Sequence, residues 1–182
     1  MQITCHTSLL FRGAFIGRFQ PLHLGHLATI KYALRSVHEL IIVIGSAQKS
    51  HESKNPFTAG ERIEMIRGSL QGDHEINMDK IFLIPVPDID IHSLWTHQVD
   101  LLVPRYNVIF TNDIFTRQLY IERGITVIEP AMYRREEFSA TEVRTRIANG
   151  QEWKQLVTHQ TAKIIEEIGG IERIRQLYNL AQ

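Results

Sequence analysis

Short apolar runs alternate with segments of helical periodicity along most of the chain, and this alternation limits the possible folds more than any other feature. Residues 40–44 (Leu-Ile-Ile-Val-Ile) form a continuous branched run, which is typical of a parallel strand covered on both faces. Further apolar runs predict strands over residues 8–16, 81–86, 106–110 and 125–128. Apolar residues at helical spacing predict helices around residues 27–37, 58–70, 92–103 and 114–123. In the third of these helices, Leu94, Val99 and Leu102 are expected to face inward.

Strands that alternate with helices predict an α/β fold: an open, mostly parallel, Rossmann-like sheet with helices on both faces. After Pro130 the pattern is helical to the end, with Gly169 and Gly170 between the last two helices. We expect one domain, residues 1–182, made of an α/β core (about 8–130) and a C-terminal helical part (about 131–182). Ligands of such sheets bind beyond the carboxyl ends of the strands. Here these are the loops after Gly17, Gly45, Pro87 and Thr111.

The charge balance and the cysteine content exclude several classes of protein. Lys+Arg and Asp+Glu number 20 each, so the excess of positive charge expected for a nucleic-acid or membrane-surface protein is missing. Cys5 is the only cysteine, which excludes an intramolecular disulfide and a cysteine-based zinc site. No apolar run approaches membrane-spanning length. We therefore expect a cytoplasmic protein with no nucleic-acid or membrane partner.

The segment between the first predicted strand and the first predicted helix is rich in groups that bind anions. It reads Gly-Arg-Phe-Gln-Pro-Leu-His-Leu-Gly-His over residues 17–26. His23 and His26 stand one turn apart at the amino end of the helix, where free N–H groups and the helix dipole attract phosphate. Gly25 has no side chain, so a phosphate or a base could approach the backbone closely. With Arg18, the two imidazoles would form an anion cradle, although a solvated loop is the alternative interpretation.

A second segment, Phe-Ser-Ala-Thr-Glu-Val-Arg over residues 138–144, stands at another predicted helix start. Ser139 and Glu142 have the spacing of a capping box, which is its structural interpretation. A capping box explains neither Thr141 nor Arg144. At positions i and i+3 these two would point to the same side and offer a hydroxyl and a guanidinium to a triphosphate.

Together these segments resemble a known family. Residues 17–26 resemble the H-x-G-H signature of the nucleotidyltransferase superfamily and, within it, are similar to the nicotinamide mononucleotide (NMN) adenylyltransferases. Residues 138–144 resemble the superfamily's second phosphate motif, and the resemblance extends from about residue 13 to 177. It implies that ATP is bound by Gly17, Arg18, Phe19, Gln20, His23, Gly25, His26, Ser139, Thr141 and Arg144.

The resemblance also implies a site for NMN. Residues 45–62 are similar to the archaeal branch of the family, which places the mononucleotide near Ser46. Lys54 stands where an arginine is frequent. Trp95 is expected to stack on the nicotinamide ring, with half-buried core as the alternative role. Asn112 is implied near the nucleotide, and a helix cap is its alternative.

The implied reaction transfers AMP from ATP to NMN and gives NAD and pyrophosphate, with Mg²⁺ arriving with ATP and no metal site in the protein. The residues expected to act on the phosphates are His23, His26, Arg18 and Arg144. Relatives form homo-oligomers, often hexamers, and the same is expected here by resemblance. The alternatives are another H-x-G-H adenylyl- or cytidylyltransferase, or a non-catalytic nucleotide sensor.

Overall fold

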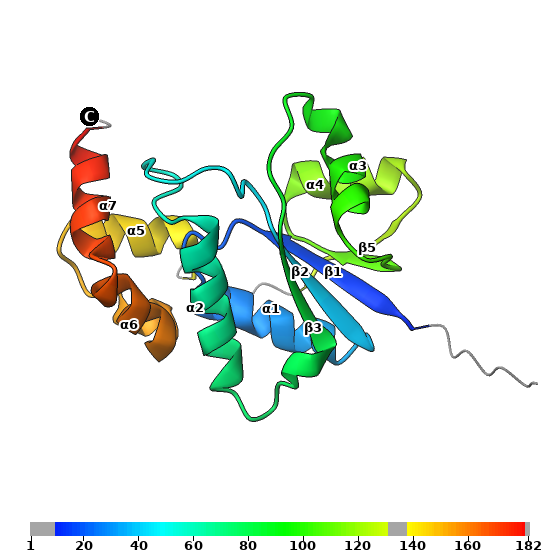
Figure 1. Cartoon of the computed structure of the whole chain (residues 1–182), viewed down its shortest axis with the longest axis horizontal. Helices are drawn as coiled ribbons and strands as arrows, with labels where there is room; N and C mark the ends of the chain where they lie inside the picture. Colours follow the sequence, from blue (N-terminus) through cyan, green and yellow to red (C-terminus); the bar gives the residue numbers. More distant parts are fainter. Residues whose placement is uncertain (1–9, 131–137, 181–182) are drawn as a thin grey trace, which may run out of the picture.

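A five-stranded parallel sheet lies at the centre of the molecule, with strand order β3-β2-β1-β4-β5 (Figure 1). The structure, a computed structural model, describes residues 10–130 and 138–180. Every pairing between neighbouring strands is parallel, which confirms the prediction of a Rossmann-like α/β fold. The strands are β1 (Arg12–Gly17), β2 (Glu39–Ile44), β3 (Ile81–Pro85), β4 (Val108–Phe110) and β5 (Thr126–Ile128).

Helices cover both faces of the sheet. Figure 1 shows α1 (Leu24–Leu34) and α2 (Ala59–Gln71) on one face, and α3 (Trp95–Leu102) and α4 (Ile114–Glu122) on the other. The C-terminal helices lie beyond α2, and α6 packs directly against it. These helices are α5 (Ala140–Ala148), α6 (His159–Glu167) and α7 (Gly170–Asn179). Short 3-10 turns occur at Met78–Lys80, His92–Leu94 and Lys154–Leu156.

The side chains of β2 explain why the central strand is a continuous apolar run. Leu40, Ile42 and Ile44 pack in one apolar cluster with α1, α2 and the C-terminal helices, whereas Ile41 and Val43 pack in a second cluster with α3 and α4. All five side chains are fully buried. Because alternate residues of a strand point to opposite faces, a strand between two helical layers has no polar positions to offer.

The ends of several predicted elements differ from the observed ones; β4, for example, begins at Val108 rather than at residue 106, and α1 ends at Leu34 rather than at residue 37. The first strand begins at Arg12 rather than at residue 8; residues 8 and 9 lie outside the described part of the chain. The predicted helix over residues 92–103 is divided into a 3-10 turn and α3.

The prediction that Leu94 and Leu102 face inward is wrong, because they are 42% and 46% exposed. Val99 is buried as predicted, and Trp95 and Thr96 form the rest of the buried side of α3. Leu94 belongs to the preceding 3-10 turn, whose tighter winding places it on a different face, and Leu102 is the last residue of the helix.

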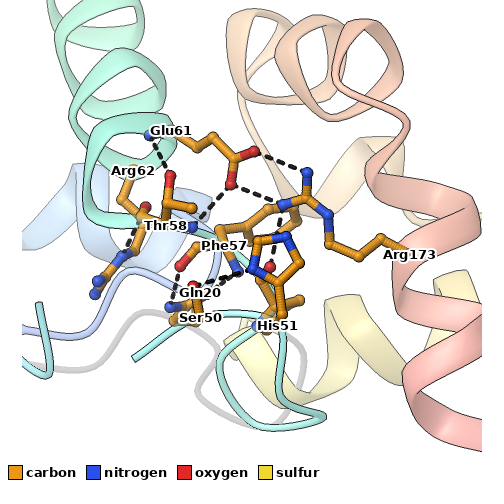
Figure 2. A network of polar contacts seen from close by, with 9 residues as sticks. Gln20, Ser50, His51, Phe57, Thr58, Glu61, Arg62 and Arg173 are labelled. Atoms are coloured by element: carbon orange, nitrogen blue, oxygen red, sulfur yellow. Dashed lines mark hydrogen bonds and ion pairs between the residues drawn. The ribbon is translucent and has the colours of Figure 1, made fainter. Parts of the chain in front are cut away.

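Helix α7 is fastened to the start of α2 by a partly buried ion pair. Thr58 and Glu61 form the predicted capping box of α2. The Glu61 carboxylate also accepts hydrogen bonds from both Nη atoms of Arg173, at 2.8 and 2.9 Å (Figure 2). Arg173 Nη1 donates as well to the carbonyl oxygen of Pro56 at 3.1 Å. The C-terminal helices are thus connected to the loop before α2.

The two glycines between α6 and α7 permit this contact. Gly169 has φ of 66°, a left-handed conformation that glycine adopts without strain. A Cβ atom on Gly170 would lie 2.9 Å from the carbonyl oxygen of Ile165 and 3.0 Å from the ring of Phe57. The division of the last two helices at these glycines is therefore confirmed, and Gly170 is required by close packing.

We predict that Glu61→Gln lowers the free energy of unfolding by about 1–3 kcal/mol at neutral pH, because glutamine can keep the capping box but loses the charged contact with Arg173. Burial opposes ionisation of the Glu61 carboxyl, but the hydrogen bonds from Arg173 and Thr58 outweigh it and lower the pKa. A lowered carboxyl pKa contributes stability that is present above the unfolded pKa and lost as pH falls through the folded one. The difference between wild type and variant, measured by denaturant unfolding, should therefore shrink below pH of about 4.

Glu167→Gln is the matched control, since Glu167 forms an exposed pair with Lys163 at 3.6 Å. Its effect should stay below about 1 kcal/mol. Equal losses in the two variants, or a loss for Glu61→Gln that does not change with pH, would contradict the assignment.

Candidate active site

Two adjoining cavities lie at the carboxyl edge of the sheet, where β1 separates the two halves of the strand order. The first, about 310 Å³, is lined by α1 and by the segments after β4 and before α5. The second, about 380 Å³, is lined by the loops after β1, β2 and β3 and by α3 and α4. Ile16 and Asp113 line both cavities, so the two share a boundary. This is the edge at which ligands of open parallel sheets bind.

Two histidines at the start of α1 form the most distinctive feature of the first cavity. His23 Nδ1 accepts a hydrogen bond from the backbone N–H of His26 at 3.3 Å, and His26 Nδ1 accepts from the N–H of His23 at 3.4 Å. The rings are stacked, with centroids 3.7 Å apart. The pair is a capping box made of imidazoles. Because each Nδ1 is an acceptor, the proton of each neutral ring lies on Nε2, which is a donor.

Both rings are neutral at pH 7. Burial lowers the pKa of His23 to about 4. The pKa of His26 lies well below its usual value, first because of burial and second because of the neighbouring His23. The ring of Phe19 backs His26 at a centroid distance of 4.7 Å and contributes to this apolar surrounding. The first cavity therefore offers two N–H donors that need no proton from solvent.

Gly25 also lines the first cavity, as predicted, and the structure shows why a glycine stands there. A Cβ atom at this position would lie 3.0 Å from His23 Nδ1 and 3.3 Å from the Cβ of Phe138. Any side chain would therefore press on the histidine ring that caps the helix.

Two residues of the first motif, Phe19 and Gln20, are buried and contact other residues of the protein rather than a cavity. Phe19 is 1% exposed, packs edge-on against Phe15 and lies tilted against the ring of His26. Gln20 is equally buried; its amide donates to the carbonyl oxygen of Phe57 at 2.8 Å and accepts from the Phe57 N–H at 2.9 Å (Figure 2). The structure places neither side chain on the lining of the two cavities. Their expected contact with ATP stays a prediction.

In the second motif, too, some residues line a cavity and others are buried against the protein. Ser139 caps α5 by accepting the N–H of Glu142 at 3.1 Å, and it lines the first cavity. Thr141 and Arg144 face each other as predicted, at 3.3 Å between Oγ1 and Nη2. Arg144 is only 5% exposed and donates from Nη1 to the carbonyl oxygen of Gln20 at 2.7 Å. It thus ties the two motifs together from behind the cavity, and burial lowers its pKa.

The second cavity contains Arg18, Gly17, Ser46 and Trp95. Trp95 is 8% exposed within an apolar cluster and also lines the cavity, and its stacking on nicotinamide stays a prediction. Ser46 belongs to a polar group built around Asp88, which follows β3. The Ser46 hydroxyl donates to Asp88 Oδ1 at 3.1 Å, and Lys49 Nζ lies 3.3 Å from Oδ2.

Four predicted residues lie elsewhere than their companions. Gly17 and Arg18, expected at the ATP phosphates with the histidines, line the second cavity and not the first. Asn112 lines the first cavity, with the histidines, rather than the second with Ser46 and Trp95. It is not the helix cap either, because Asp113 accepts the N–H of Thr116 at 2.8 Å and caps α4. Lys54 is exposed in the loop between β2 and α2 and lines neither cavity.

Two residues that the sequence analysis did not single out are prominent in the structure. Asp113 is shared by both cavities, and its position directly after β4 was the available signal. Arg62 is fully buried and donates to four backbone carbonyl groups. Its signal was a charged residue four positions before Ile66, within the apolar stripe of α2.

The described residues contain no group of three or more His, Cys, Asp or Glu side chains placed to hold a metal ion. Within the same ranges, 10–130 and 138–180, no helix is both long and apolar enough to cross a membrane.

Comparison with known proteins connects this geometry to a family. Residues 14–146 match the family described as cytidylyltransferase-like. The chain is 45% identical to the nicotinamide-nucleotide adenylyltransferase of Thermococcus kodakarensis over 166 residues, which cover 91% of this chain and 88% of the relative. It is also 45% identical to the enzyme of the same name from Archaeoglobus fulgidus, over 91% of this chain and 97% of the relative.

Among solved structures, the chain resembles a bifunctional NMN adenylyltransferase/ADP ribose pyrophosphatase from Francisella tularensis, solved with AMP and a manganese ion. The TM-score is 0.77 at 26% identity, over 93% of this chain. The match spans 52% of the Francisella chain, about half of its length. On this evidence the chain belongs to the cytidylyltransferase-like family and, within it, to the nicotinamide-nucleotide adenylyltransferases.

Proposed function

We propose that the protein transfers AMP from ATP to NMN, forming NAD and releasing pyrophosphate. The observation that carries the proposal is the pair of adjoining cavities, one with the neutral histidine pair at a helix start and the other with Trp95. Two cavities that share the lining residues Ile16 and Asp113 suit a reaction that joins two nucleotides.

In this proposal the ATP phosphates occupy the first cavity. They would accept hydrogen bonds from the Nε2–H groups of His23 and His26, close to the start of α1 and to Ser139 at the start of α5. NMN would occupy the second cavity, with its ring against Trp95 and its phosphate near Arg18. The phosphate of NMN and the α-phosphate of ATP would then meet beside Ile16 and Asp113.

In the reaction, a phosphate oxygen of NMN attacks the α-phosphorus of ATP. A P–O bond forms, the bond from the α-phosphorus to the bridging oxygen breaks, and pyrophosphate leaves with that electron pair. The nucleophile is already an anion, so no general base is needed, and catalysis consists of positioning and of stabilising the developing charge. Neutral N–H donors suit this task because they require no proton to be moved.

We further propose that a divalent cation, Mg²⁺ in the expected case, binds with ATP and is held mainly by phosphates and water. Asp113 lines both cavities, and its carboxylate, which caps α4 through Oδ1, fits a contact with such an ion, directly or through water. When bound, the cation would neutralise charge on the phosphates.

Two further expectations belong to the proposal. We expect the enzyme to act in the cytoplasm, where ATP is abundant. We also expect a homo-oligomer, a hexamer by resemblance. Exposed apolar side chains on α3 and α4 support self-association: Leu101, Ile114 and Phe115 are 81%, 72% and 72% exposed.

A coupled pyrophosphate assay tests the function. Pyrophosphate release should require both ATP and NMN and should produce one NAD per pyrophosphate. Higher turnover with CTP, or with pantetheine phosphate or riboflavin phosphate as acceptor, would favour another nucleotidyltransferase activity. Binding of both nucleotides without pyrophosphate release would favour a sensor.

His26→Ala should lower kcat about 10²- to 10³-fold, with KM for either substrate changed only a few-fold. A donor that meets charge growing in the transition state is worth about 2.7–4 kcal/mol and acts on kcat. Steady-state kinetics with both substrates checks this.

Alanine also removes a cap of α1, so His26→Gln is the companion variant: glutamine at this position can retain the cap. It should fold like wild type and still be slow. His74→Ala, at an exposed position far along the chain, is the control for histidine loss. A folded His26 variant with nearly normal kcat would exclude this role of the motif.

Trp95→Leu should raise KM for NMN about 5- to 30-fold, corresponding to about 1–2 kcal/mol of lost cation–π contact, and leave KM for ATP nearly unchanged. Leucine keeps an apolar side chain in the cluster and removes the aromatic face. Trp153→Leu is the matched control, because Trp153 is 7% exposed and lines neither cavity. If the KM values for NMN and ATP rose equally, Trp95 would have only a structural role in the apolar core.

A further inference from the structure

Arg62, on α2, is a buried cation whose partners are backbone oxygens. It is 0% exposed. None of the ion pairs among the described residues includes it. Burial is the main reason that the pKa of Arg62 is lowered to about 10, still far above neutral pH. A buried charge is costly unless it is fully hydrogen-bonded. An apolar residue would fill the stripe of α2 at lower cost, so the charge requires an explanation.

The explanation lies in which oxygens Arg62 binds. Nη1 donates to the carbonyl oxygen of Arg18 at 2.9 Å and to that of Gly45 at 2.8 Å. Nη2 donates to the carbonyl oxygen of Ser46 at 3.1 Å. Nε donates to that of Thr58, the cap of its own helix, at 3.2 Å (Figure 2). One planar group therefore joins the loop after β1, the loop after β2 and the start of α2.

The loop after β1 and the loop after β2 both line the second cavity. Arg18 and Ser46 both line it, and the loop after β1 leads directly to the histidines of the first cavity. Ser46 is held with φ of 49°, a conformation that a serine rarely adopts, so its geometry depends on what surrounds it. The distance between the two loops helps to set the distance between the two proposed substrates.

We infer that Arg62 is a positioning residue that holds the loop bearing Arg18 and the loop bearing Ser46 in the register needed for transfer between ATP and NMN. This inference rests on the proposed function. Arg62 touches neither substrate. It acts through the backbone, by fixing where the ends of β1 and β2 place their side chains.

The inference separates binding from transfer. Each substrate should still bind when the loops are less firmly joined, because its own contacts remain. Transfer should suffer, since a misplacement of about 1 Å between reacting groups can cost on the order of 100-fold in rate. Simple loss of stability would instead reduce the amount of folded protein without changing the rate per folded molecule.

Arg62→Lys is the decisive variant. Lysine keeps the charge but has a single nitrogen, which cannot reproduce the planar fork that reaches both loops. Per binding-competent site, kcat should fall about 10- to 100-fold, whereas the Kd of each nucleotide measured alone should change by about threefold or less. Arg62→Met removes the side-chain donor of the four carbonyls, of which those of Ser46 and Thr58 keep a backbone donor, and is expected to unfold more easily. Arg67→Met, exposed on the same helix, is the matched control and should behave like wild type.

Wild type, Arg62→Lys and Arg67→Met are compared by steady-state kinetics, titration with each nucleotide and thermal unfolding. A folded Arg62→Lys protein with normal kcat overturns the inference, even if its Tm is lower. An Arg62→Lys protein with normal kcat and equally raised KM values for ATP and NMN overturns it as well. A wild-type protein that forms no NAD overturns the proposed function instead, and that result is seen before any variant is measured.

Discussion

Backbone carbonyl groups at the carboxyl ends of β1 and β2 must find donors once they are buried, and much of this structure follows from how they do so. The Gly45 N–H donates to the carbonyl oxygen of Gly17 at 2.9 Å and joins the two strand ends directly. The guanidinium of Arg62 satisfies the carbonyl groups just beyond them. Unpaired buried backbone groups are rarely tolerated. The loops that carry the proposed substrate contacts are therefore fixed by the same bonds that complete the sheet.

The site combines buried neutral donors with an exposed cation. The rings of His23 and His26 are desolvated and uncharged, whereas Arg18 stands at the solvent-exposed side of the second cavity. Neutral donors stabilise negative charge that develops during a reaction, but they bind anions in the ground state less tightly than a cation does. An exposed guanidinium can attract a phosphate from solvent. This division suits a reaction whose substrates and product are all anionic.

The fold class and the edge of the sheet at which the cavities lie were largely predictable from the sequence, because hydrophobic periodicity indicates where strands and helices begin and end. The direction of individual side chains was not. A motif specifies residue types, but the side chain of Gln20 binds the backbone of Phe57 and that of Arg144 binds the backbone of Gln20, and neither lines a cavity. Such choices depend on partners far away in the chain. Arg62 was missed for the same reason, since its four acceptors come from three separate segments.

The order in which these contacts occur along the chain has a consequence for synthesis. The sheet can be completed once β5, ending at Ile128, has left the ribosome. The contact of Gln20 with Arg144, however, can form only after 124 more residues have been synthesised. That of Glu61 with Arg173 needs 112 more. A nascent chain that stops short of α7 therefore carries a finished sheet, while the segment that leads into α2 still lacks its contacts with Arg173. The last helix, which lines neither cavity, is thus the last element to secure the start of α2, the helix that carries Arg62.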